Sequence, residues 1–292
     1  MHGEPSRARW RPTPFLLGSA GWHAACAVAL GVTPARWPAV AGALVANHAL
    51  IAGAGLWPRS RWLGPNCDRL PAAAARRGEV ALTFDDGPDP EVTPRVLELL
   101  AGHGGARATF FCIGRRAAAH AGLVGELARQ GHRVENHSHS HPAAFSLLPP
   151  AALAREVRLA QETLARAAGR PPELFRAPAG LRSFLLEPVL AAQGLRLASW
   201  TRRGFDTVVN DPLRVVRRLL ANLAAGDVLL LHDGSAARDR RGRPVVLEAL
   251  PRLLDGIAAR GLRPVPFAPG NGNARGAGGD PRAPQAVRRE EK

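Results

Sequence analysis

The distribution of hydrophobic and charged positions separates an apolar N-terminal part of the chain from a mixed remainder. No residue between Arg11 and Arg36 is charged, and a second uncharged run covers 37–57. Each run has about 20 residues, the length that a helix needs to cross a bilayer core of roughly 30 Å. The pattern predicts two transmembrane helices, over about 14–32 and 37–57, in a membrane anchor that comprises residues 1–62. Tryptophans near the boundaries of both runs are typical of membrane interfaces: Trp10, Trp37, Trp57 and Trp62.

The link between the two runs, 33–36, is short and contains proline, which predicts an antiparallel hairpin. Two alternatives compete with it. The first run could be the apolar region of a signal peptide, with a small-residue cleavage site near 27–29, or both runs could be buried helices of a soluble domain. Two adjacent uncharged runs favour the hairpin. We expect Asn47 and His48, inside the second run, to make polar contacts between the helices rather than a proton path.

The arginines around the hairpin predict its orientation. They flank its two ends, and a single one, Arg36, lies in the turn; the flanking ones are Arg7, Arg9, Arg11, Arg59 and Arg61. Because positive residues favour the cytoplasmic side, both ends and the following domain are predicted to be cytoplasmic, on the inner membrane of a bacterial-type cell. A periplasmic domain is the alternative if only the second run spans the membrane.

After a linker over 63–77, short β-like runs alternate with helical stretches up to residue 269. This alternation of strands and helices predicts an α/β barrel or an open parallel sheet. The expected strands are Val80–Phe84, Ala108–Cys112, Arg133–Asn136, Leu174–Arg176, Leu197–Trp200, Val228–His232 and Arg263–Pro266. The expected helices are Pro94–Gly102, Ala121–Gln130, Pro150–Ala168, Leu185–Gln193, Leu213–Ala224 and Val245–Arg260. Residues 270–292 are rich in Gly, Pro and charge, and are predicted to be a disordered tail.

Composition excludes several classes of protein. Three widely separated cysteines do not indicate a disulfide scaffold or a cysteine-based zinc finger. The net charge of +15 could indicate nucleic acid as a partner. However, the basic residues are nearly all arginines spread along the chain, and no basic patch is interleaved with aromatic residues. We therefore expect no nucleic-acid binding.

Candidate chemistry collects where the predicted strands end, as functional groups do in α/β barrels. The first strand ends in Thr83-Phe84-Asp85-Asp86-Gly87-Pro88. Two adjacent carboxylates point in different directions and can take different roles, although the run could also be an Asp-Gly turn with a helix cap.

The third strand ends in a histidine-rich run, 136–142. His137 and His141 are four residues apart, so one turn of helix would place both imidazoles on the same face. Two such histidines and one aspartate are a facial ligand set for a catalytic divalent metal. In an extended segment His139 would join them, whereas in the favoured helical turn it points away. A histidine-rich surface loop is the alternative.

Two further strand ends carry polar residues. Arg176 is followed by the turn 177–180; an arginine here can orient a carboxylate, and the turn can direct a backbone N–H at an oxyanion. His232 follows a fully apolar strand, and together with the other groups it is a candidate general acid.

These motifs resemble, in order, those of the polysaccharide deacetylase family, also called carbohydrate esterase family four or the chitooligosaccharide deacetylase homology domain. The resemblance covers roughly 78–267 and predicts a deacetylase domain over 78–269. The five matching motifs are Thr83–Pro88, His137–His141, Arg176–Gly180, a weakened Trp200–Asp206, and Leu230-Leu231-His232. The first two together are highly specific.

The resemblance implies a distorted (β/α) barrel of about seven parallel strands and metal-dependent removal of acyl groups from a sugar. It implies that one divalent metal ion, usually Zn²⁺, is held by Asp86, His137 and His141. It also implies that Asp85 is the general base and that His232 protonates the leaving sugar amine. The remaining implied roles are Arg176 holding Asp85, Asp206 holding Arg176, the Ala179 N–H stabilising the oxyanion, and Leu230 lining a pocket for the acyl methyl group.

The chain departs from the family pattern at three positions. Ala179 stands where an aromatic residue is common, and Arg203 and Thr207 stand where the fourth motif usually has an aspartate and a tryptophan. Losing both aromatic residues should open or flatten the sugar groove. These departures put the usual polymer substrates of the family in question more than its chemistry.

The predicted function is a membrane-anchored N-deacylase acting on N-acetylglucosamine-type residues of a glycan or a lipid-linked saccharide. A cytoplasmic domain would favour a lipid-linked precursor, and a periplasmic one peptidoglycan or an exported polysaccharide. The alternatives are a non-catalytic glycan-binding module on the same fold and a basic membrane-surface scaffold. The presence of both a candidate base and a candidate acid favours an enzyme. The oligomeric state, and the choice between acetyl and formyl groups, stay open.

Overall fold

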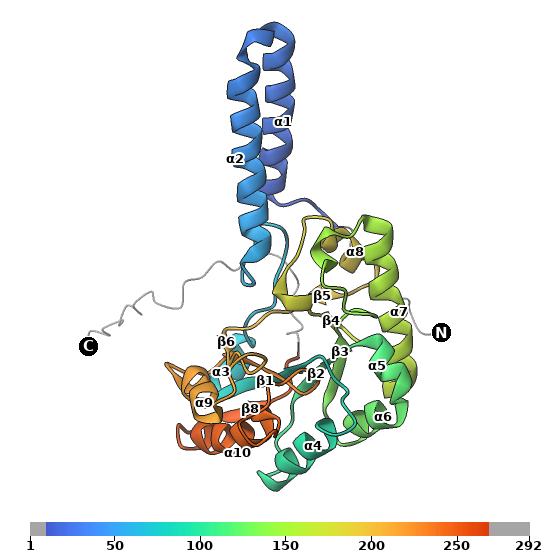
Figure 1. The fold of residues 1–292 in the computed structure, drawn as a ribbon, viewed down its shortest axis with the longest axis vertical. Helices are drawn as coiled ribbons and strands as arrows, with labels where there is room; N and C mark the ends of the chain where they lie inside the picture. Colours follow the sequence, from blue (N-terminus) through green and yellow to red (C-terminus); the bar gives the residue numbers. More distant parts are fainter. Residues whose placement is uncertain (1–9, 269–292) are drawn as a thin grey trace, which may run out of the picture.

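The computed structural model describes residues 10–268, and the predicted disordered tail, 270–292, lies outside them. A helical hairpin projects from an α/β domain (Figure 1). Helix α1 covers Pro14–Val32 and helix α2 covers Trp37–Leu56, with the short 3-10 turn η1, Pro34–Arg36, between them. The side chain of Thr13 caps α1 by accepting a hydrogen bond from the backbone N–H of Leu16, at 3.2 Å.

The two helices of the hairpin pair through polar groups in an otherwise apolar contact. The side-chain amide of Asn47 donates to the hydroxyl of Ser19 at 2.8 Å. The ring of His48 meets that of His23 edge to face, with centroids 5.1 Å apart. The expected interhelical role of both polar residues is thus confirmed. Both helices are apolar, with mean hydropathy 1.6, and are long enough to cross a bilayer, but little of either is buried in the protein.

The α/β domain contains a parallel sheet in the order β5-β4-β3-β2-β1-β7-β6, and β8 pairs with the beginning of β1. The strands are β1 Glu79–Asp85, β2 Thr109–Cys112, β3 Arg133–Asn136, β4 Leu174–Phe175, β5 Arg196–Leu197, β6 Arg202–Arg203, β7 Val228–His232 and β8 Arg263–Val265. The path of seven strands is the predicted distorted barrel, open between β5 and β6, so that it forms a half-barrel. The expected strands are present, except that the fifth, expected over Leu197–Trp200, is the two-residue strand Arg196–Leu197. Strand β6 was not expected, because a two-residue strand has no periodicity from which it could be predicted.

Helices cover the outside of the half-barrel. They are α4 Thr93–Gly102, α5 Gly114–Ala119, α6 Ala121–Arg129, α7 Pro150–Ala168, α8 Leu186–Ala192, α9 Pro212–Leu220 and α10 Val245–Ala258. Helix α3, Ala72–Arg76, instead places Ala74 in the inner apolar cluster with Phe111 and Leu230. The short turns η2, Phe145–Leu147, and η3, Pro178–Gly180, follow β3 and β4. The six predicted helices are present, whereas the short helices α3 and α5 were not expected.

Side-chain alternation along the central strands decides what faces the inside of the half-barrel. In β1, Val80, Leu82 and Phe84 belong to the apolar cluster under the helices. The residues between them therefore face the opposite way, which places Thr83 and Asp85 inside. The same alternation in β7 turns Leu229 and Leu231 outward and Leu230 and His232 inward. Since Asp85 is the register partner of His232, the two candidate catalytic residues leave neighbouring strands at the same level.

Candidate active site

The predicted metal ligands lie together. One ligand atom from each of Asp86, His137 and His141 lies within 4.8 Å of the others. Oδ1 of Asp86 is 3.2 Å from Nε2 of His137 and 3.3 Å from Nε2 of His141. Asp86 has φ 72°, in the left-handed region, so its side chain leaves the strand end in a different direction from that of Asp85. The expectation that the adjacent carboxylates diverge is confirmed.

The expected helical turn over 137–141 is wrong. These residues form a loop in which Ser138 and His141 have φ values of 63° and 52°. The Ser138 N–H donates to Oδ1 of Asn136 at 3.0 Å, and the His141 N–H donates to Oγ of Ser138 at 3.1 Å. Two left-handed residues fold the chain back on itself and bring the histidines together without a helix. His139 is outside the cluster, because its ring lies against Gly114 of α5.

A residue outside the five sequence motifs, Glu156, holds the loop 137–141 in place. Glu156, on α7, accepts hydrogen bonds from the N–H groups of His139 and Ser140, at 3.1 and 2.8 Å, and from the Ser140 hydroxyl at 2.8 Å. Sequence reasoning missed Glu156, since it lies inside an ordinary amphipathic helix. Ser235, also missed, donates its hydroxyl hydrogen to Oδ2 of Asp86.

The three ligands suit a divalent metal ion. Nδ1 of His137 is 2.8 Å from the carbonyl oxygen of Arg176. A carbonyl only accepts, so Nδ1 carries a proton, and Nε2 is the nitrogen that faces Asp86 and could bind a metal. Oδ1 of Asp86 is buried and has no hydrogen-bond partner in the described part of the chain. A buried carboxylate oxygen without a partner, facing two imidazole nitrogens, is the donor set of an Asp-His-His metal site.

The ionisation of Asp86 and His141 fits that role. Burial would raise the pKa of Asp86, but His137, and then His232 and Ser235, outweigh burial and lower it. Burial and the charge of His137 lower the pKa of His141. Asp86 is therefore anionic and His141 neutral at neutral pH. For His137, burial lowers the pKa, but Asp85 and Asp86 overcome it and the pKa is raised, so protons compete with a metal at this ligand.

Asp85 is held by an arginine in the centre of the half-barrel. Arg176 is fully buried, and its Nη1 donates to Oδ1 of Asp85 at 2.6 Å and to the hydroxyl of Thr83 at 2.9 Å. Its guanidinium carbon lies 3.9 Å from the ring centroid of Phe111. Oδ2 of Asp85 lies 4.0 Å from Nε2 of His137, so the second oxygen faces the ligand cluster. The predicted contact between Arg176 and Asp85 is confirmed.

The expectation that Asp206 holds Arg176 is wrong. Asp206 accepts from the backbone N–H of His232 at 2.8 Å, and its other oxygen lies 2.9 Å from Nδ1 of His232. The sheet order explains the difference, because β6, which precedes Asp206, is next to β7 and far from β4, which precedes Arg176. Burial would lower the pKa of His232, but the hydrogen bond and charge of Asp206 overcome burial and raise it.

The two predicted pocket residues lie at the same end of the sheet. Ala179 has φ 55° in the turn η3, next to Gly180, where a Cβ would come within 2.4 Å of the Trp200 ring. Leu230 is buried in β7, in an apolar cluster with Phe111 and Trp200. Their roles toward an oxyanion and an acyl group stay predictions.

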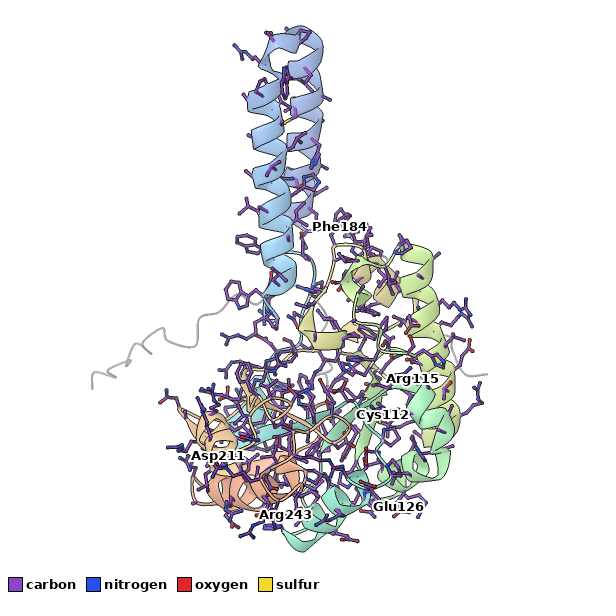
Figure 2. All side chains as sticks on the ribbon, viewed as in Figure 1. Cys112, Arg115, Glu126, Phe184, Asp211 and Arg243 are labelled. Atoms are coloured by element: carbon purple, nitrogen blue, oxygen red, sulfur yellow. The ribbon has the colours of Figure 1, made fainter. Side chains whose placement is uncertain are left out.

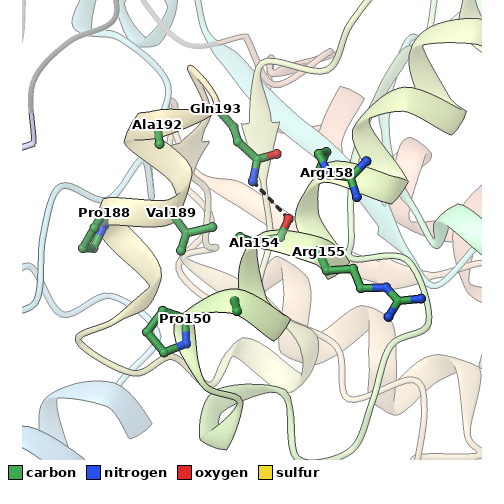
Figure 3. A pocket seen from close by; sticks show the side chains of 9 residues that line it. Pro150, Ala154, Arg155, Arg158, Pro188, Val189, Ala192 and Gln193 are labelled. Atoms are coloured by element: carbon green, nitrogen blue, oxygen red, sulfur yellow. Dashed lines mark hydrogen bonds between the residues drawn. The ribbon is translucent and has the colours of Figure 1, made fainter.

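A groove of about 640 Å³ lies elsewhere, between α7 and α8 (Figure 3). Its walls are Pro150, Ala154, Arg155, Pro188, Val189 and Gln193, together with neighbouring small residues and Arg158. Gln193 crosses it and donates to the carbonyl oxygen of Ala154 at 3.3 Å. No predicted site residue lines this groove. The groove is therefore distinct from the candidate active site at the strand ends.

Comparison with known proteins finds relatives of the predicted family. The family model described as "Polysaccharide deacetylase" matches residues 72–198. A chitooligosaccharide deacetylase of Azorhizobium caulinodans is 35% identical over 201 residues, which cover 65% of this chain and 94% of the relative. The chain belongs to the polysaccharide deacetylase family. The predicted family and enzyme class, a hydrolase of the deacetylase type, are thereby confirmed.

Solved structures of polysaccharide deacetylases share the fold. The family 4 carbohydrate esterase from Streptomyces lividans, in complex with acetate, matches with TM-score 0.58 and 34% identity, over 64% of this chain and 91% of that one. The Bc1960 peptidoglycan N-acetylglucosamine deacetylase matches with TM-score 0.62 and 28% identity, over 69% and 90% of the two chains. The family model spans β1 to β5 of the α/β domain, which includes Asp85, Asp86, His137 and His141.

The first prediction concerns the loop of metal ligands. Glu156→Ala should lower metal affinity by about 10- to 100-fold, because two backbone N–H groups of the loop lose their acceptor. Metal titration of the purified chain would measure this. Glu162→Ala is the matched control, since Glu162 lies on the same helix but pairs with Arg158 at the surface. Equal affinities of the two variants would show that Glu156 does not position the ligands.

Proposed function

We propose that this chain is a membrane-anchored, zinc-dependent hydrolase that removes N-acetyl groups from N-acetylglucosamine-type sugars of a glycan or lipid-linked saccharide. The supporting observation is that the Asp86-His137-His141 cluster lies beside a carboxylate held by arginine and a histidine held by aspartate. A glycan-binding module would need neither a base nor an acid. The retained Asp85 and His232 therefore favour catalysis over the non-catalytic alternative.

The mechanism follows from the positions of these residues. A divalent metal ion held by the three ligands would activate a water molecule and polarise the acyl carbonyl. Oδ1 of Asp85 is occupied by Arg176, which leaves Oδ2 to take the proton of the attacking water. The backbone N–H of Ala179 would stabilise the oxyanion that forms as water adds to the carbonyl carbon. His232 then donates a proton to the sugar nitrogen, the C–N bond breaks, and acetate and the free amine leave.

Zinc is proposed because two imidazoles and one carboxylate, with open positions, are a common ligand set of catalytic zinc. The membrane anchor is proposed because α1, with 19 residues, rises about 28 Å, close to the roughly 30 Å of a bilayer core. Apolar helices that are mostly exposed on the protein need another apolar environment. Arg11, Arg59 and Arg61 at the domain end of the hairpin favour a cytoplasmic domain at the inner membrane.

Two substitutions test the catalytic assignment. Asp85→Asn should retain bound zinc and lower kcat for acetate release by at least about 100-fold, because the base is lost. Asp86→Ala should lose zinc. Metal content by mass spectrometry and acetate release from an N-acetylated chitooligosaccharide are the two readouts. Acetate release by Asp85→Asn at the wild-type rate would overturn the mechanism.

The pH profile tests the pairing of His232 with Asp206. The raised pKa of His232 keeps the acid protonated to higher pH, so activity is present below this pKa and is lost as pH rises through it. Asp206→Asn removes the stabilising charge and should move the alkaline limb of kcat to lower pH. Asp211→Asn, at the exposed cap of α9, is the control and should leave the limb in place. An unshifted limb in Asp206→Asn would exclude His232 as the acid.

The orientation is tested by reporter fusions after Pro269. A reporter that is active only in the cytoplasm should give signal, because the arginines lie at the domain end of the hairpin. A signal from the periplasmic reporter instead would overturn this orientation, and peptidoglycan or an exported glycan would become the substrate to test.

A further inference from the structure

The hairpin joins the domain at the edge of the sheet that carries the site. The Arg182 N–H donates to the carbonyl oxygen of Gly55 in the last turn of α2, at 3.2 Å. The Arg182 side chain donates back to the carbonyl oxygen of Ser60 at 2.5 Å. Arg182 is three residues beyond Ala179, so the two Cα atoms are at most about 11 Å apart. The membrane helix thus ends next to the proposed oxyanion turn.

We call the contact of Arg182 with Gly55 and Ser60 the joint. Side-chain hydrogen bonds continue from this joint into the candidate active site. The amide of Asn66 donates to the carbonyl oxygens of Pro58 and Ser60, at 2.7 and 3.2 Å, and its oxygen accepts from the hydroxyl of Ser199 at 3.0 Å. The carbonyl oxygen of Ser199 accepts from Nη2 of Arg176 at 3.2 Å. Since the joint is bonded throughout, it does not act as a flexible linker, and the site keeps its place relative to the hairpin.

Exposed apolar side chains surround the joint. Trp57, Trp62 and Phe184 are 58%, 51% and 45% exposed. The ring of Trp62 packs on Phe15 at the beginning of α1, with centroids 5.0 Å apart. Figure 2 shows Phe184 on the side of the domain from which the hairpin projects. In the proposed hairpin both helices need their full length to cross a bilayer, which would place these three side chains at the height of the lipid headgroups.

Arg203 supplies a positive charge at the same site. It is the register partner of Leu230, so its side chain faces the inside of the half-barrel. Its guanidinium lies 5.5 Å from the Trp200 ring centroid and 5.0 Å from that of Phe205. Within residues 10–268 Arg203 forms no ion pair with a carboxylate, and its Nε is buried without an acceptor. A guanidinium held by aromatic rings and lacking an anion fits a ligand that brings one.

We infer that the substrate is an N-acetylated sugar joined through phosphate to a membrane lipid, with the phosphate bound by Arg203. The inference rests on the proposed function and holds for either side of the membrane. The joint places the site at the bilayer surface, where such a saccharide is already concentrated. In an N-acetylglucosamine 1-phosphate ester, the phosphate and the acetamido group are on neighbouring ring carbons, so one site can contact both. A neutral soluble chitooligosaccharide offers neither the phosphate nor the lipid.

Three substrates, given to the zinc-loaded full chain in vesicles, test the inference: an N-acetylglucosaminyl pyrophosphate ester of a polyprenol, a neutral glycolipid with the same sugar, and a soluble chitooligosaccharide. We expect kcat/KM to be highest for the first, by about tenfold or more. Arg203→Gln should lower kcat/KM about 10- to 100-fold for the phosphate ester alone. Phe184→Ser should lower it for both lipid-borne substrates. Leu213→Ser, which is also exposed (57%) but lies on α9 away from the hairpin, should lower it for neither.

The outcomes separate this inference from the proposed function. Equal kcat/KM for the soluble and phosphate-linked sugars would overturn the inference and leave the deacetylase intact. Acetate release from none of the three substrates would overturn the proposed function itself. A preference for both lipid-borne substrates that Arg203→Gln does not change would retain the membrane-borne sugar and exclude the phosphate contact.

Discussion

A single buried guanidinium, that of Arg176, is the constraint on which the site depends. Its side chain reaches from the end of β4 across the inside of the half-barrel to Asp85 and Thr83 on β1. Its own carbonyl oxygen fixes the ring of His137. One residue therefore orients both the proposed base and a proposed metal ligand. A fully buried charge must be paired, and removing the partner of such a pair costs about 3–5 kcal/mol, so the strands on both sides are held in one arrangement.

The deacetylase chemistry is divided between two parts of the sheet. The proposed ligands and the proposed base follow β1 and β3, whereas the proposed acid His232 and its partner Asp206 follow β7 and β6. Parallel pairing makes all these strands end at the same edge, which is why residues almost 150 positions apart in the sequence converge. Helix α7 lies outside this arrangement and still contributes, through Glu156, to the position of the ligand loop.

The motifs at the strand ends made the fold and the candidate ligand set predictable. The loop conformation and the partners of several residues could not be predicted, because they depend on local backbone geometry. Asp86, His137 and His141 were found from residue type and spacing, although the helical turn used to argue for them is absent. The left-handed φ values at Ser138 and His141 could not be predicted, because the run 136–142 contains no glycine to indicate them. The partner of Asp206 could not be predicted either, because the choice between Arg176 and His232 depends on the two-residue strand β6. Glu156 could not be predicted, because it binds backbone N–H groups, which nearly every residue has.

The turn after β1 has no room for a side chain at Gly87. A Cβ at Gly87 would lie 2.3 Å from Oδ2 of Asp233, a carboxylate that is fully enclosed and bound to the hydroxyl of Thr93. The backbone beside Asp86 is therefore sized for a hydrogen atom, and side-chain variation there would displace the ligand itself. Ala179, in the turn after β4, Arg203, in β6 itself, and Thr207, after β6, are the positions that depart from the family pattern. A residue larger than glycine at position 87 would have to move either Asp86 or Asp233, whereas the three departures from the family pattern lie in other segments of the site.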